Sequence, residues 1–86
     1  LNMKMLKRID NYLNERKYKI ILNENMINIE NYDEIINFTL TNISVKCSDK
    51  VINIDGTNLT ISKMFEKEVL ITGNVTSIRI NQLNKT

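Results

Sequence analysis

Cys47 is the only cysteine of the 86 residues, and nothing in the sequence points to a base that could activate its thiol. The chain has no histidine, so it offers neither an imidazole base nor the commonest metal ligand at neutral pH. Cys47 ends an alternating apolar segment, where a small core residue is expected. A single cysteine excludes an internal disulfide and is typical of a reducing compartment.

The carboxylates of residues 21–86 are scattered and fall mostly in predicted turns. They are Glu24, Glu30, Asp33, Glu34, Asp49, Asp55, Glu66 and Glu68. A Ca²⁺ loop needs acidic residues at alternate positions before a final Glu, and a phosphate loop needs closely spaced glycines before a helix. Neither pattern is present. We therefore expect no catalytic residues, no metal site and no cofactor, and we interpret the protein as non-enzymatic.

The first twenty residues differ from the rest of the chain in charge. Residues 1–20 carry six basic and two acidic residues, a net of +4, whereas residues 21–86 carry six basic and eight acidic residues, a net of −2. In the basic part, Met5, Leu6, Ile9, Tyr12 and Leu13 recur at spacings of three and four, which places them on one helical face. We predict a helix at about residues 2–15 within a basic amphipathic segment, residues 1–16.

Two roles are open for this segment. A small sheet with one apolar face needs a cover, and the helix would supply it. A basic amphipathic helix can also lie on an anionic membrane surface, where each basic residue contributes about 1 kcal/mol. The residues predicted to contact a membrane or a partner are Lys4, Lys7, Arg8, Arg16 and Lys17.

Beyond residue 16 the hydrophobic period changes to two, which indicates strands. Alternating apolar positions occur at 18–22, 27–29, 36–40, 43–47, 52–54, 59–61, 69–71 and 75–80. The connections are too short for parallel crossovers, which need about a dozen residues. The predicted fold is mainly β: a small antiparallel meander of seven to eight short strands, folded as a sandwich or roll, at residues 17–82 after the N-terminal helix. A short solenoid stays open as an alternative, and residues 83–86 are expected to form a disordered tail.

The two glycines occupy the same frame, each two residues after an isoleucine and five before another. Gly56 stands in "DGTN" and Gly73 in "TGNV", and both are predicted to close a strand at a tight turn with positive φ. The other predicted turns are "NEN" (23–25), "NYDE" (31–34), "TN" (41–42), "SDK" (48–50) and "MFEKE" (64–68).

Binding of nucleic acid by a small β-module is the alternative function. It requires a basic groove with aromatic platforms. The strand region is net acidic, and Tyr18 and Phe38 fall at predicted core positions. We therefore expect no nucleic acid among the partners.

Residues 27–80 carry the motifs of a known family. "I-x-G-x-x-L-x-I" is met by Ile54, Gly56, Leu59 and Ile61, and a closing "I-x-G-x-[IV]-x-x-I" is met by the segment 71–78. Strands like "INIEN", "EIINF" and "ISVKC" precede them. The chain resembles the YabP/YqfC family of sporulation proteins of endospore-forming Firmicutes, and its short YqfC-like branch more closely. It departs from the family at "SDK", where a glycine is common, and in lacking a Leu-Pro pair near the end of the N-terminal segment.

The resemblance implies a non-catalytic protein that assembles or binds others in forespore envelope or spore coat formation. It also implies as partners a YqfD-like sporulation membrane protein or coat proteins. Independently of the resemblance, the basic N-terminal segment makes peripheral membrane contact possible, and a homo-oligomer is a further possible state. No apolar run is long enough to span a membrane, and no secretory signal is present. We expect the protein in the cytoplasm or at the forespore membrane of the developing cell, and not secreted.

Overall fold

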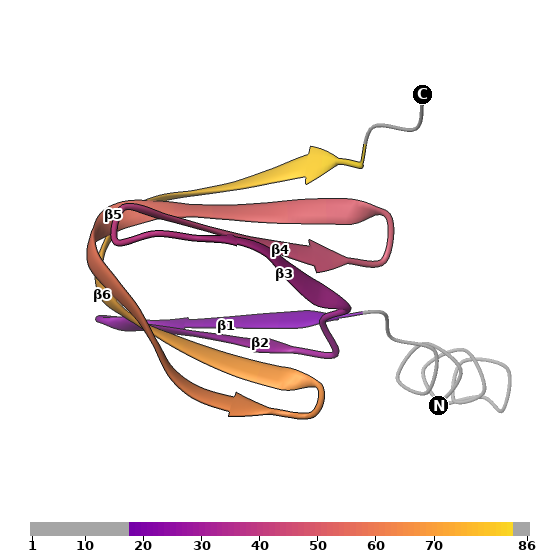
Figure 1. Ribbon diagram of the computed structural model, residues 1–86, viewed down its shortest axis with the longest axis horizontal. Helices are drawn as coiled ribbons and strands as arrows, with labels where there is room; N and C mark the ends of the chain where they lie inside the picture. The colour runs from indigo at the N-terminus through magenta and orange to yellow at the C-terminus, as the bar shows by residue number, and fades with distance from the viewer. Residues whose placement is uncertain (1–17, 84–86) are drawn as a thin grey trace, which may run out of the picture.

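A computed structural model describes residues 18–83, and all the regular structure in that range is β-strand. The strands are β1 (Lys19–Asn23), β2 (Met26–Glu30), β3 (Glu34–Phe38), β4 (Asn42–Cys47), β5 (Lys50–Phe65) and β6 (Glu68–Gln82). They form one antiparallel sheet in the order β1-β2-β6-β5-β4-β3 (Figure 1). The predicted antiparallel, mainly β fold is confirmed for these residues. The predicted helix at 2–15 lies outside the described residues, and so does the predicted tail at 83–86 apart from Leu83, whose backbone N–H donates to Asp49 O at 2.8 Å.

The number of strands differs from the prediction of seven to eight, because β5 and β6 are long. β5 has 16 residues and contains both segments predicted around Gly56, and β6 has 15 residues and contains both segments around Gly73. The hydrophobic alternation is interrupted at each glycine, although strand pairing between β5 and β6 continues past it. The interruption in the sequence pattern therefore marks a change of strand direction.

Both long strands bend near their middle, so the sheet turns back over itself (Figure 1). The upper half in this view contains β3, β4, residues 50–55 of β5 and residues 77–82 of β6. The lower half contains β1, β2, residues 60–65 of β5 and residues 68–72 of β6. The β5–β6 register shifts between Asp55 and Gly56 and again between Thr57 and Thr60, as at β-bulges. The short solenoid that stayed open as an alternative is not formed in the described residues, whose strands form one bent, open sheet.

The placement of the glycines in hairpin turns was wrong, since both lie inside strands at the bend. Gly73 has a φ of +130°, as predicted for it, but Gly56 has no positive φ. Within residues 18–83, the positive-φ residues besides Gly73 are Asn31, Ser48 and Asn58. Asparagine tolerates this conformation better than most residues with a Cβ, so the turns of this chain need little glycine.

The hydrophobic core lies between the two halves of the bent sheet. Its members come from β2, β4, β5, β6 and the β2–β3 connection: Ile27, Ile29, Tyr32, Ile43, Val45, Cys47, Ile52, Ile54, Leu59, Val69 and Ile71. Directly paired residues of antiparallel strands share a face, and the register pairs Val45 with Ile52 and Ile43 with Ile54. The period-two pattern thus puts one apolar face of each half inside, as the alternation predicted.

Candidate functional site: the open sides of the bent sheet

The residues predicted to contact a membrane or partner, Lys4, Lys7, Arg8, Arg16 and Lys17, lie outside the described residues. Gly56 and Gly73 lie together at the bend, where the chain passes too closely for side chains. A Cβ on Gly73 would stand 2.6 Å from the carbonyl oxygen of Asn58, and one on Gly56 would overlap the carbonyl oxygen of Asn74. Both glycines therefore have a structural role, through close backbone approach at a bend rather than through a hairpin turn.

Cys47 is fully buried in the core at the end of β4. Burial, more than the neighbouring charge of Asp33, raises the pKa of its thiol to about 11. A thiol in this state is protonated at neutral pH and a poor nucleophile. The prediction that Cys47 is a small core residue is confirmed.

Asp33 connects two turns at the end of the sheet opposite the bend. Its Oδ2 accepts a hydrogen bond of 2.8 Å from the backbone N–H of Ser48, and Lys46 Nζ lies 3.4 Å from the same oxygen. The Ser48 hydrogen bond is the main cause of a lowered pKa of Asp33. Ser48 has a φ of 55°, so this carboxylate holds a turn in the left-handed region.

Asp55 cross-links three strands on the outer face of the upper half. Its Oδ1 accepts a hydrogen bond of 2.9 Å from Asn42 Nδ2, and its Oδ2 accepts bonds of 3.0 Å from Ser77 Oγ and Arg79 Nε. The hydrogen bond from Arg79, with those from Asn42 and Ser77, lowers the pKa of Asp55 to about 2. Since Asp55 directly precedes Gly56, this network fixes β4, β5 and β6 together beside the bend.

The acidic side chains thus have structural partners or lie apart from one another. No group of three His, Cys, Asp or Glu side chains within residues 18–83 is arranged to hold a metal ion. That range also contains no helix with the length and apolarity needed to cross a bilayer. The remaining candidate for a binding site is a set of exposed apolar side chains at the edges of the sheet.

Four large apolar side chains of the inner face are more than half exposed. Leu22 pairs with core residue Ile27 and is 60% exposed, and Met64 pairs with Val69 and is 56% exposed. The other two are Phe38, which pairs with Ile43, and Ile80, which pairs with Ile52. Within the described residues, each of these four side chains lies on a strand segment that pairs with another strand on one side only. The core is therefore uncovered along both sides of the bent sheet.

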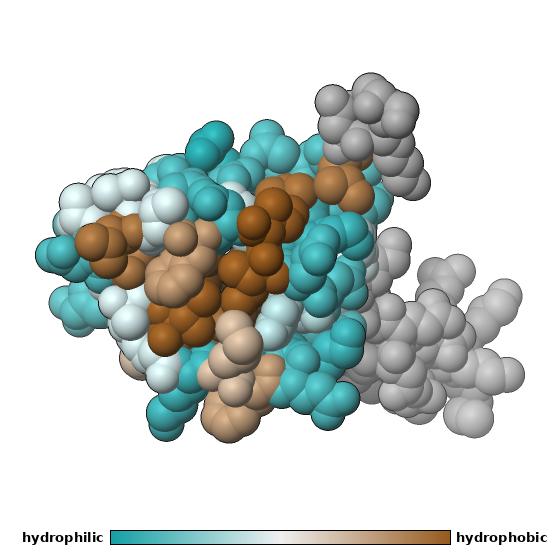
Figure 2. Space-filling view, in the orientation of Figure 1, coloured by the Kyte–Doolittle hydropathy of each residue, from teal (hydrophilic) through white to brown (hydrophobic). Residues whose placement is uncertain are grey.

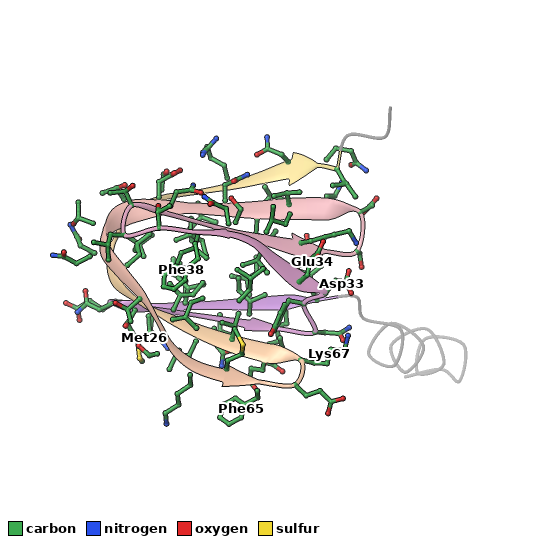
Figure 3. All side chains as sticks on the ribbon, in the orientation of Figure 1. Met26, Asp33, Glu34, Phe38, Phe65 and Lys67 are labelled. Atoms are coloured by element: carbon green, nitrogen blue, oxygen red, sulfur yellow. The ribbon has the colours of Figure 1, made fainter. Side chains whose placement is uncertain are left out.

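We name the first of these openings the β3/β5 side. Its exposed apolar residues are Ile36, Phe38 and Leu40 at 50–63% exposure, together with Met64 on β5. It is closed at the bend, where the backbone N–H of Leu59 donates to Leu40 O at 2.9 Å. Phe38 lies between the upper and lower halves in projection (Figure 3). Figure 2 shows hydrophobic residues gathered in a band across the face seen in the same orientation.

We name the second opening the β1/β6 groove. One wall is the end of β1 and the following turn, Leu22, Asn23 and Glu24, and the other wall is residues 75–78 of β6. The groove has a volume of about 710 Å³. Val75 and Ile78 pack against the core from this side. The groove is lined by apolar side chains with polar ones beside them. Such a lining is suited to bind a hydrophobic side chain or segment rather than a charged ligand.

Sequence reasoning missed both openings. Phe38 was predicted in the core, but it is 52% exposed, because β3 is an edge strand. Tyr18 is partly buried and packs against the core, in agreement with its prediction. Alternation identifies the inner face of a strand, but the strand order decides which inner residues are covered. One feature of the sequence could have indicated an exposed apolar edge: the bulky apolar residues concentrated in "EIINFTL" at residues 34–40.

These features define the class of the protein as a small all-β domain built on one bent antiparallel sheet. The model of the YabP family matches residues 14–86. The chain therefore belongs to the YabP family, a family of sporulation proteins. Neither the curated proteins nor the solved structures gave a match to the chain.

Proposed function

We propose that the protein is a non-catalytic binding module that assembles with other proteins in forespore envelope or spore coat formation, and that it acts through the β3/β5 side. Membership of the YabP family supports the sporulation role. The motifs of residues 27–80 favour the YqfC-like branch, and with it a YqfD-like membrane protein or a coat protein as the partner. The proposed location is the cytoplasm or the forespore membrane surface of the developing cell.

The observation that carries this proposal is the exposed apolar edge formed by β3. An edge strand presents unpaired backbone groups that can accept a further strand. Natural edge strands are commonly protected against strand addition by lysine, proline, a bulge or a short length, and β3 itself has five residues and a bulge. Its apolar side chains remain uncovered, since Ile36, Phe38 and Leu40 are exposed along this edge, which favours a partner that packs against them.

The irregularity of β3 is compatible with such a partner. The β3–β4 register shifts between Ile35 and Asn37, so Ile36 is the extra residue of a bulge. A bulge redirects a side chain at a sheet margin. Ile36 is 50% exposed, so a charge placed there should affect a partner far more than the core.

The test is complementation of a deletion in the spore-forming host, scored by heat-resistant spore counts and by coat and cortex morphology. The wild-type gene and the control variant Asn25→Lys, which adds the same charge in the β1–β2 turn, should restore spores. Ile36→Lys should fold normally but fail to restore them. Normal spores after deletion would overturn the sporulation role, and full rescue by Ile36→Lys would overturn the β3/β5 side as the binding surface.

A further inference from the structure

The β1/β6 groove lies beside the strand through which the N-terminal segment enters the sheet. The described chain begins at Tyr18, and β1 starts at the next residue. β1 is an edge strand, and its far end forms one wall of the groove. The opposite wall is a part of β6 that lies beyond its pairing with β2. A segment that leaves Tyr18 and reverses direction would therefore pass along β1 into the groove.

We propose that residues 2–15 of this same chain occupy the β1/β6 groove and cover the core on that side. The chemistry of the segment fits the opening. Its apolar positions, Met5, Leu6, Ile9, Tyr12 and Leu13, share one face at helical spacing. The groove offers a matching apolar surface, in which Leu22 is 60% exposed and Val75 and Ile78 of the opposite wall pack against the core. Ile80, two residues beyond this wall on β6, is 52% exposed.

The length of the segment also fits. Fourteen residues at helical rise span about 21 Å, and the five residues of β1 span about 17 Å. A helix that runs back along β1 thus reaches from Tyr18 to the groove wall at Leu22. In this direction Tyr12 and Leu13 lie near the start of β1, and Met5 and Leu6 lie near Leu22 and Ile78.

Charge favours the same arrangement. Residues 18–83 carry six Lys and Arg against eight Asp and Glu, a net of −2, and the segment 1–17 carries five against two, a net of +3. Glu24 stands at the groove wall where the start of the segment would arrive. With the apolar face turned inward, Lys4, Lys7 and Arg8 lie on other faces of the helix and keep their charges in water.

The test is disulfide trapping in the full-length protein with paired cysteines. Leu6→Cys is combined with Leu22→Cys in the groove, or with Met64→Cys on the β3/β5 side as the matched comparison. Two cysteines are bridged readily only when their Cα atoms lie within about 7 Å. Cys47 is buried and does not compete. Mild oxidation should give an intramolecular disulfide in a monomer for the Leu22 pair, and little for the Met64 pair.

Three results would overturn the proposal. A Leu22 disulfide formed between two chains would identify a second copy as the occupant. Equal trapping by both pairs would show that the segment has no preferred site. No trapping, together with co-sedimentation of the wild-type protein with phosphatidylserine vesicles at low salt, would place the segment on a membrane surface.

A second measurement uses a matched pair of substitutions in the segment. Ile9→Asp places a charge on the apolar face, and Asn11→Asp places the same charge on the opposite face. Ile9→Asp should lower the Tm of the full chain by about 4 °C or more, as for the loss of an apolar contact in a domain of this size, and Asn11→Asp should leave it unchanged. Equal Tm values would overturn the docking. Both measurements use purified protein, so they stand or fall separately from the sporulation role.

Discussion

Gly56 lies directly against the backbone carbonyl of Asn74, with no space for a Cβ between the two strands. A Cβ at this position would also lie 3.0 Å from Leu59 Cδ2, a side chain that is fully buried in the core. The bend of β5 over β6 therefore requires a residue without a side chain here. The same contact region includes Gly73, where an added Cβ would lie 2.9 Å from the Cα of Leu59.

Replacement of either glycine by alanine should therefore destabilise the domain. Gly56→Ala must displace backbone atoms of β6, and Gly73→Ala adds an unfavourable φ of +130° to a backbone overlap. We expect the free energy of unfolding to fall by about 2 kcal/mol or more in each case. Urea denaturation of the purified variants measures it. The control Thr60→Ala, at an exposed position of β5, should stay within about 0.5 kcal/mol of wild type.

Stability should depend on the charge of Asp55 in acid. Its pKa is lowered from 3.8 to about 2 by the hydrogen bonds from Arg79, Asn42 and Ser77. The folded state thus binds this proton less readily than the unfolded chain, so the contribution is complete above pH 3.8 and is lost as the pH falls through about 2. Asp55→Asn should be less stable than wild type at neutral pH, and this difference should shrink between these two pH values.

Urea midpoints measured across that range test the assignment. Asp33 has a lowered pKa as well, so some acid sensitivity should remain in Asp55→Asn. Glu66→Gln, in the β5–β6 turn, is the matched loss of an exposed carboxylate and should leave the neutral-pH midpoint near wild type. A constant difference between wild type and Asp55→Asn over the whole range would contradict the role of the Asp55 charge.

Cys47 should resist thiol reagents in the native protein. Burial and the raised pKa of about 11 leave almost no accessible thiolate at neutral pH. A colorimetric disulfide reagent should react with it only as fast as the domain unfolds, and at once in denaturant. Rapid labelling of the native protein would show that the end of β4 opens locally.

Substitution of Cys47 is a separate test of the same environment. Cys47→Ser places a hydroxyl group in an apolar site, and we expect a loss of about 1–3 kcal/mol in the free energy of unfolding. Cys47→Ala lacks the hydroxyl and should cost less. If serine were tolerated better than alanine, the site would have to contain a hydrogen-bond partner.

Nucleic acid should not bind the protein with the signature of phosphate contacts. The described residues are net acidic, with six Lys and Arg against eight Asp and Glu, and binding to phosphates weakens steeply as salt rises. A gel-shift series with single-stranded and duplex DNA and RNA, from low to moderate salt, should show no shift. A shift that disappears steeply with salt would favour the alternative of a nucleic-acid-binding module.

The local features of this protein follow from patterns along its sequence. Period-two alternation identified the strand-forming segments and the inward face that carries Ile27, Ile52 and Val69. The short polar connections required antiparallel pairing, and the turns at residues 24–25, 48–49 and 66–67 occur where Asn, Ser, Asp, Glu and Lys were expected. These features depend on neighbours along the chain, so they are visible in the sequence pattern.

Which strands are neighbours, and which side chains are therefore covered, depends on contacts between distant parts of the chain. A glycine between two alternating segments is compatible with a hairpin or with a bend, and the close approach of β5 and β6 selects the bend at Gly56 and Gly73. The strand order then makes β1 and β3 the edges, which leaves Leu22 and Phe38 exposed although their alternation is that of core residues. Burial depends on neighbours distant in the chain, and alternation within one strand carries no information about them.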